Sequence, residues 1–291
     1  MIASASNYPQ RRRLTTTRLS DNIDGDQGRG CMIGKRGSAT TSISTADAAS
    51  ITVRGKDLTR DLMGHVSFSS YFFLLSTGQA PTKEQEFFLD LLLVAIAEHG
   101  LVPTNQVARM TLAAEPGCLQ AAVAAGILGC GSVILGTAEA CGQYLQQARS
   151  TTESAADKDA ALKAHVRGIR DAGLKIPGFG HPVHKPVDPR TERILELAEQ
   201  HGVAGPYVDL ARRTHSAVHE VWGKPLTMNV SMMIAAVLLD LDFPAAILKG
   251  VPILARTASL LAHLAEEKET PIGFLMAHHA EEAISYEEKL A

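Results

Sequence analysis

Along most of the chain after residue 51, apolar residues recur at the spacing of one face of an α-helix. Runs of β-branched residues are few, which favours packed helices over sheet. We expect a short strand or turn over residues 51–56 and irregular structure from residue 269 onward. The predicted helices cover residues 57–75 with a break near Gly64, 82–98, 119–129, parts of 139–173, 191–202, 206–221, 229–241 and 243–265.

Two of these segments carry sharper local signals. Thr82 and Gln85 have the spacing of a capping box at a helix start, and Gly100 suits the position just past the end of the same helix. His99 therefore lies at a helix C-terminus, where the helix dipole favours a protonated imidazole. Residues 119–129 are small and apolar throughout, which predicts a buried helix that packs closely on its neighbours.

The first 50 residues are rich in Ser, Thr, Gly and Asp, so we expect residues 1–30 to form a flexible N-terminal arm. The basic run Arg11–Arg13 lacks the apolar segment that a secretory signal needs. No apolar run reaches about 18 residues, and a membrane span is not expected. The four cysteines lack metal-site or redox spacing, which predicts reduced thiols in a cytoplasmic protein. A net charge of -3 gives no reason to expect nucleic-acid binding.

The candidate chemistry is concentrated between Pro177 and Arg190, where the sequence reads PGFGHPVHKPVDPR. The glycines allow a tight turn and close approach of the backbone to a ligand. His181 follows this turn and can transfer protons near neutral pH. Arg190 follows an Asp-Pro break and offers a planar fork for a carboxylate. The segment therefore predicts a site for an anionic substrate.

The same segment resembles the active-site loop of the citrate synthase family, written G-F-G-H-R-V-Y-K-x-x-D-P-R. Further family motifs follow in the expected order: YFFLLSTGQAPT at residues 71–82 resembles "LLxGxxPT", Glu98-His99 resembles the family's histidine segment, PLTMNV at residues 225–230 resembles the approach to "NVD", and ILARTASLLAHL around Arg256 resembles "ARTxGxxAH". The resemblance covers roughly residues 51–265.

One segment narrows the resemblance to a branch of the family. Citrate synthases carry a histidine in G-P-L-H-G-G-A-N-E, which stabilises the enol of acetyl-CoA. Residues 131–139 align with this segment and have Ile134 in the histidine's place. The citryl-CoA lyase module of ATP-citrate lyase also lacks this histidine, and the short part before His99 is similar to that branch. The chain is therefore closer to citryl-CoA lyases than to true synthases.

The resemblance implies an all-α, two-domain fold that forms a homodimer or a larger homo-oligomer, with residues 119–129 as a candidate dimer face. Residues 31–135 and 242–291 would form the large domain. Residues 136–241 would form the small domain, which carries the His181 loop and closes as a lid. The implied reaction cleaves a 3-hydroxy-3-carboxyacyl-CoA, such as citryl-CoA or citramalyl-CoA, without a tightly bound cofactor or metal.

The resemblance also implies a role for each site residue. His181 would remove the hydroxyl proton while His99 holds or polarises the same oxygen, and Arg190 and Arg256 would bind substrate carboxylates. The residues implied to contact coenzyme A are Leu135, Gly136, Val183, His184 and Lys185.

The chain departs from the family pattern where the "NVD" aspartate should stand, because Ser231 occupies that position. Either Ser231 relays a proton through water, or another acid has moved in. Asp240 and Asp242 are near in sequence but would lie about two to three helical turns away. The second carboxylate-binding arginine is not evident, and His278 or His279 falls near its place.

The alternatives to the lyase function are a Claisen-type citrate or methylcitrate synthase and a non-catalytic acyl-CoA-binding paralogue. His215 and His219 have metal-ligand spacing without a third ligand.

Overall fold

The computed structural model describes residues 39–131 and 133–288. The chain divides into two compact units, residues 1–41 and residues 42–291, and all the elements below belong to the second. The predicted arm at residues 1–30 lies outside the described residues.

A small antiparallel sheet opens the described chain. It contains β1 (Ser44–Ala46), β2 (Ile51–Val53) and β3 (Lys56–Asp57) in the order β1-β2-β3. A tight turn at Arg54 and Gly55, both with positive φ, joins β2 to β3. The predicted strand or turn at residues 51–56 is confirmed. The expectation of an all-α fold is corrected to a mainly helical one, because the described chain also contains this three-stranded sheet.

The next helices begin and end where the sequence signals lie. The π-helix η1 (Leu58–Leu62) stops before Gly64, whose φ is 79°, and α1 (Phe68–Thr77) begins after the cap Ser67. The helix α2 (Lys83–Ala97) starts with the predicted capping box between Thr82 and Gln85. Both boundary predictions are confirmed.

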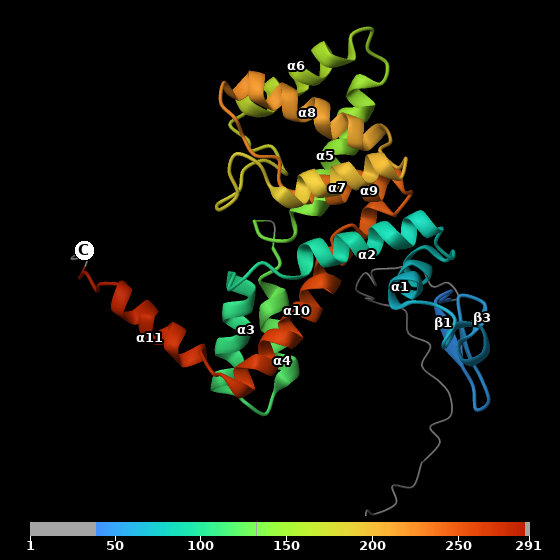
Figure 1. The fold of residues 1–291 in the computed structure, drawn as a ribbon, viewed down its shortest axis with the longest axis vertical. Helices are drawn as coiled ribbons and strands as arrows, with labels where there is room; N and C mark the ends of the chain where they lie inside the picture. Colours follow the sequence, from blue (N-terminus) through green and yellow to red (C-terminus); the bar gives the residue numbers. More distant parts are fainter. Residues whose placement is uncertain (1–38, 132, 289–291) are drawn as a thin grey trace, which may run out of the picture. The chain divides into compact units, whose positions relative to one another are not determined.

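The remaining helices pack in two groups that α2 connects (Figure 1). In the first, α10 (Gly250–Glu269) packs against α2, α3 (Pro103–Ala114) and α4 (Leu119–Leu128). The second group is built around the apolar helix α9 (Val230–Asp240), whose residues are buried from Val230 to Leu239. It also contains α5 (Thr137–Thr152), α6 (Lys158–Asp171), α7 (Pro189–Gln200) and α8 (Pro206–Trp222), while the short helix η2 (Ala245–Ile247) leads toward α10.

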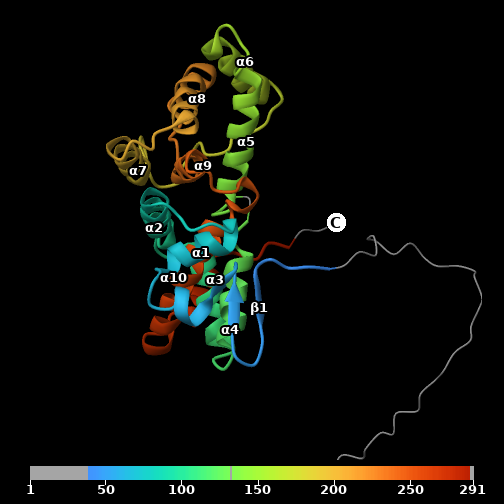
Figure 2. The same cartoon turned by 90° about the vertical axis from the view of Figure 1, so that its right-hand side faces the viewer.

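The turned view in Figure 2 again shows α5, α6, α8 and α9 together, with α3, α4 and α10 apart from them. The helix α2 contacts α10 in one group and α7 and α9 in the other. Its C-terminal end, where His99 follows, therefore lies between the two groups. The division at residues 136 and 241 into a small and a large domain stays a prediction, because residues 42–291 form one compact unit.

Two expectations about helices are wrong. In α4 only Ala122 and Gly126 are buried, and Leu128 is 86% exposed, so the helix packs on one side instead of being buried all round. The chain after residue 269 also contains α11 (Gly273–Ala283). Its start is fixed by Glu267, whose buried carboxylate accepts hydrogen bonds from the backbone of residues 272 and 273. The carboxylate lies five and six residues before these backbone groups, outside the three-residue spacing of a capping box.

One segment, Ala245–Glu269, is long and apolar enough to cross a membrane by length and composition, with a mean hydropathy of 1.4. In the described residues its α10 portion packs against α2, α3 and α4. Arg109 on α3 pairs with both Glu266 and Glu267 on α10. These contacts are those of a core helix that packs by polar as well as apolar groups.

The close contact between α4 and α10 requires glycine at position 126, because a side chain there would not fit. A Cβ atom added to Gly126 would lie 2.7 Å from Leu260 and 2.9 Å from the backbone oxygen of Thr104. The backbone oxygen cannot move without shifting α3, so we expect Gly126→Ala to lower the free energy of unfolding by about 1–3 kcal/mol. Thermal unfolding of the purified variant measures the effect.

Gly168 in α6 is the matched control, because a Cβ atom there meets no atom within 4 Å. Gly168→Ala should raise the melting temperature slightly, since alanine is favoured over glycine inside a helix by about 0.5–1 kcal/mol. Equal or higher stability of the Gly126 variant would contradict the close packing described for α4.

Candidate active site

The loop that carries His181 is fastened to the start of α9. Gly178 and Gly180 both have positive φ, of 79° and 94°, which glycine adopts without strain. The backbone of Asn229 donates to Gly178, and its side-chain amide donates to the oxygen of Gly180 over 3.1 Å. A Cβ atom on Gly178 would lie 2.8 Å from Met232. The glycine turn and α9 therefore hold His181 in a fixed place.

The hydrogen bonds of His181 determine which ring nitrogen carries its proton. Its Nδ1 accepts hydrogen bonds from the backbone N–H groups of Val183 (3.1 Å) and His184 (2.8 Å). An atom that accepts two N–H groups cannot itself be protonated, so the neutral ring carries its proton on Nε2. His181 is thus a hydrogen-bond donor toward the pocket, whereas the sequence resemblance implied a base.

Arg190 is held beside His181 by a buried carboxylate. The side chain of Asp188 is fully buried and accepts from Arg190 Nε (3.0 Å), Arg190 Nη2 (2.9 Å) and the backbone N–H of Val230 (3.1 Å). Burial alone would raise the pKa of Asp188, but the hydrogen bonds and charge of Arg190 lower it overall. Asp188 therefore joins the starts of α7 and α9, a role that the sequence analysis missed.

An acceptor oxygen fits between Arg190 and His181. The Nη2 atom of Arg190 lies 3.4 Å from Nε2 of His181. Both atoms are donors once Nδ1 of His181 is occupied, so they cannot satisfy each other. A carboxylate or carbonyl oxygen of a ligand would accept from both. The geometry brings together the imidazole and one of the two predicted carboxylate-binding arginines.

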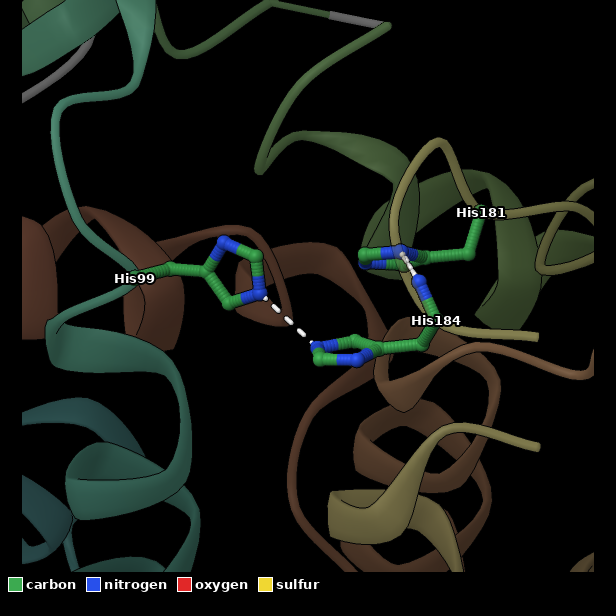
Figure 3. Close-up of side chains that lie close together, drawn as sticks. All are labelled: His99, His181 and His184. Atoms are coloured by element: carbon green, nitrogen blue, oxygen red, sulfur yellow. Dashed lines mark hydrogen bonds between the residues drawn. The ribbon is translucent and has the colours of Figure 1, made fainter.

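His99 and His184 complete a cluster of three imidazoles (Figure 3). Their Nε2 atoms lie 3.0 Å apart, and the rings of His181 and His184 stack at 4.4 Å. Burial lowers the pKa of both His99 and His181, and neighbouring cations, including Arg190, add to the effect. Burial and the nearby cations therefore act against the protonated form of His99 that the helix dipole favours.

The three imidazoles fit an oxygen atom better than a metal ion. One nitrogen from each of His99, His181 and His184 lies within 4.8 Å of the others, and the Nε2 atoms of His99 and His184 are in direct contact. A metal-bound histidine normally donates its second N–H to an acceptor. In His181 the second nitrogen instead accepts two N–H groups, and the Arg190 guanidinium adds a positive charge beside the cluster.

The guanidinium of Arg256, the second predicted clamp residue, is held by groups of the protein itself. Its side chain is 1% exposed and donates to Asn105 Oδ1 (3.0 Å), while Glu98 lies 3.8 Å away. Its buried Nε has no hydrogen-bond partner among the described residues. Its charge adds to the effects that lower the pKa of His99, and its contact with a substrate carboxylate stays a prediction.

Glu98 accepts hydrogen bonds from several groups close to Arg256. Its carboxylate accepts from Ser259 and from His263 Nε2 (3.0 Å). It also accepts from the backbone of His99 (2.9 Å) and of Gly100. Burial acts to raise the pKa of Glu98, but these hydrogen bonds and the His263 charge lower it overall. The sequence gives one hint that Glu98 is a structural partner of the site, which is its position next to His99.

Ser231 lies where the family aspartate was expected, and it has a hydroxyl partner. Its side chain is 7% exposed, and the Oγ1 of Thr137 donates to its Oγ over 2.7 Å. Thr137 begins α5 and Ser231 lies in the first turn of α9, so two helix N-termini meet at this pair. Asp240 does not replace the aspartate, because it caps α8 through the backbone of residues 207 and 208.

The residues predicted to contact coenzyme A are spread over two segments. Val183 and Lys185 are exposed on the loop, whereas the His184 side chain turns into the imidazole cluster. Leu135 has a positive φ of 63° and packs partly on the core. Gly136 is required by close approach, because a Cβ atom there would lie 2.5 Å from the oxygen of Gly131.

The remaining predicted histidines lie elsewhere. His215 and His219 are neighbours on α8, with ring centroids 5.1 Å apart. His278 and His279 are exposed on α11, where each lies 3.3 Å from Glu282. Neither pair enters the group formed by His99, His181 and His184.

This combination of a mainly helical fold and an imidazole–guanidinium pocket agrees with the comparison to known proteins. The family described as "Citrate synthase, C-terminal domain" matches residues 83–273, most of the chain, and the protein belongs to that family. "Putative citrate synthase 2" of Mycobacterium tuberculosis is 31% identical over 185 residues, which cover 62% of this chain and 47% of that protein. The chain spans about half the length of the curated relatives it matches.

Two solved structures are informative. The structure of citryl-CoA lyase from Hydrogenobacter thermophilus matches with a TM-score of 0.77 and 27% identity, covering 87% of this chain and 96% of that chain. ATP citrate lyase from Methanothrix soehngenii, solved in complex with citrate and coenzyme A, matches with a TM-score of 0.69 and 19% identity, covering 89% of this chain and 43% of that chain. The second likeness shows the fold alone.

The buried Asp188 gives a test of the site that needs no substrate. Its pKa is lowered in the folded protein, so its stabilising effect is present above the unfolded pKa of about 3.9 and is lost as the pH falls through the folded value. We expect Asp188→Asn to lower the free energy of unfolding by about 2–3 kcal/mol at pH 7, from the lost charged hydrogen bonds. Urea unfolding between pH 7 and pH 2.5 measures it.

The difference between the wild type and this variant should shrink as the pH falls below about 3.9, because Asp188 is then protonated first in the unfolded chain and, at lower pH, in the folded protein. Asp90→Asn, on the exposed face of α2, is the matched control and should track the wild type. A pH-independent deficit of the Asp188 variant would contradict the charged state assigned to this carboxylate.

Proposed function

We propose that this protein is a carbon–carbon lyase of the citryl-CoA type. Its substrate would be a 3-hydroxy-3-carboxyacyl-CoA, and its products acetyl-CoA and a 2-oxo acid. The main support is the contact between Arg190 and the donor nitrogen of His181, which suits a carboxylate next to a hydroxyl-bearing carbon. The match to a citryl-CoA lyase over 96% of that chain supports the same reaction.

The residues would divide the reaction as follows. Arg190 binds the carboxylate on C3 of the substrate, and Nε2–H of His181 donates to the C3 oxygen. As the hydroxyl proton leaves, the C2–C3 bond breaks and C3 becomes a ketone. The electron pair of the broken bond moves to C2 and forms the thioester enolate. A proton added to C2 then completes acetyl-CoA.

The hydroxyl pair of Ser231 and Thr137 would act on the enolate. A carboxylate at this position would repel a developing negative charge unless it were protonated. The hydroxyl of Thr137 donates to Ser231, which leaves the O–H of Ser231 to donate to the enolate, and the two helix N-termini add partial positive charge. We therefore assign Ser231 to enolate stabilisation, with Thr137 as the residue that positions its hydroxyl.

Several further features belong to this proposal. Val183 and Lys185 are exposed beside the pocket, where a coenzyme A thioester would enter without any tightly bound cofactor. Movement of the segment 136–241 over residues 31–135 and 242–291 would exclude water from the reacting atoms.

The exposed side of α4 offers an apolar surface for a homodimer. The free thiols of Cys118, Cys130 and Cys141 support a cytoplasmic location.

Two other functions have a specific observation in their favour. Claisen condensation by a citrate or methylcitrate synthase is supported by the 31% identity to a putative citrate synthase. Ile134, which takes the place of the enol-stabilising histidine, opposes it. A non-catalytic acyl-CoA-binding paralogue is supported by Ser231, since a serine hydroxyl exchanges protons with carbon poorly near pH 7.

Direct assays separate the three functions. Citryl-CoA and citramalyl-CoA are incubated with the protein while acetyl-CoA is followed, and oxaloacetate with acetyl-CoA while free CoA is followed. We expect acetyl-CoA release from at least one of the two thioesters. Arg190→Gln should lower kcat/KM by about 100-fold or more, because it removes a charged bidentate contact.

Arg193→Gln is the matched control, because Arg193 lies on the exposed side of the same helix and pairs with Glu196. Its kcat/KM should equal that of the wild type. Faster release of CoA in the condensation assay than acetyl-CoA release in cleavage would favour a synthase. Thioester binding without turnover in either direction would favour the paralogue.

A further inference from the structure

We infer that His184 is a third functional imidazole, and that its pair with His99 accepts the hydroxyl proton of the substrate. This inference rests on the proposed lyase function. The resemblance implied that His184 contacts coenzyme A. Its side chain instead lies 3.0 Å from Nε2 of His99, at the centre of the cluster in Figure 3. The loop motif of the family has tyrosine where this chain has His184.

An oxygen atom among the three rings would lie within hydrogen-bonding distance of each. The three nitrogens of the cluster lie within 4.8 Å of one another, so an atom at their centre is at most about 2.8 Å from each, a normal hydrogen-bond length. The direct contact between His99 and His184 would open to admit the oxygen. A hydroxyl that enters this contact exchanges one imidazole–imidazole hydrogen bond for bonds to both rings.

The protons of the three rings match the bonding capacity of a hydroxyl. His181 presents Nε2–H, since backbone donors occupy its Nδ1. His99 and His184 share a single proton in their Nε2–Nε2 contact, so one ring donates and the other accepts. Two N–H donors and one free lone pair are what one hydroxyl needs, since it accepts two hydrogen bonds and donates one.

The His99–His184 pair can accept the hydroxyl proton, which His181 cannot do while its Nε2 carries a proton. The hydroxyl proton moves to the accepting nitrogen of the His99–His184 pair and forms an imidazolium. The C2–C3 bond breaks, its electron pair becomes the enolate, and the oxygen becomes the ketone. The proton held by the pair then passes to C2, so the step balances without a cofactor or an outside acid. Tyrosine, with a pKa of about 10, could not accept this proton near pH 7.

Burial and the charges around the cluster favour the neutral form of the His99 ring. Arg190 and Arg256 act on His99 from α7 and α10, and Asp188 acts in the opposite sense. For His181 the charged neighbours are again Arg190 and Asp188, together with the other two histidines. The two arginines disfavour an added proton, so the pair is available as a base.

Substitution of His184 tests the inference in the full-length protein. His184→Gln keeps the backbone donor to His181 and can still hydrogen-bond to His99, but it cannot accept a proton. We expect kcat for thioester cleavage to fall about 100-fold, with KM within about 3-fold of the wild type. The limb of the kcat/KM–pH profile that reports the base should disappear. His219→Gln, on the exposed side of α8, should leave kcat, KM and the pH profile unchanged.

A second variant separates proton transfer from packing. His184→Gly leaves space in the cluster, and free imidazole in the buffer should restore at least about 10-fold of the lost activity. Wild-type kcat and an unchanged pH profile in His184→Gln, or no rescue of a folded His184→Gly, would overturn the inference while the lyase function stands. A wild type that cleaves neither thioester would instead refute the proposed function, and the inference with it.

Discussion

The site depends on one buried charge, the carboxylate of Asp188. It is fully buried, yet it accepts from both the guanidinium of Arg190 and the backbone of Val230. A buried carboxylate is tolerated only when such partners replace its water. The same group therefore ends the loop, starts α7 and joins it to the start of α9. Loss of this charge would release both the arginine and the helix that carries Ser231.

Around this point the pocket is built from donors. Arg190 is oriented by Asp188, His181 is restricted to a donor by two backbone N–H groups, and Ser231 pairs with the hydroxyl of Thr137. Arg256 contributes a further positive charge. Fixed donors stabilise negative charge better than water does, because they are already oriented. An oxyanion or enolate is the species that such a pocket favours.

The sequence predicted most of the fold because its signals were local. The capping box at Thr82, the break at Gly64 and the apolar run of α9 each depend on neighbours in the chain. The start of α11 escaped prediction because its cap, Glu267, lies in the preceding helix and is itself held by Arg109 from α3. At the site, His181 and Arg190 were found from their motif. The long-range partners Glu98, Asn105 and Thr137 were not, since only folding brings them to Arg256 and Ser231.

The proton position on His181 is the most direct test of this account, because the pocket as described requires a donor there. Nitrogen NMR of 15N-histidine-labelled protein, with the ring assigned by comparison with His181→Gln, reports the protonation of each ring nitrogen. The account predicts a neutral ring at pH 7 with the proton on Nε2 and none on Nδ1. A proton on Nδ1, or a doubly protonated ring at that pH, would contradict it.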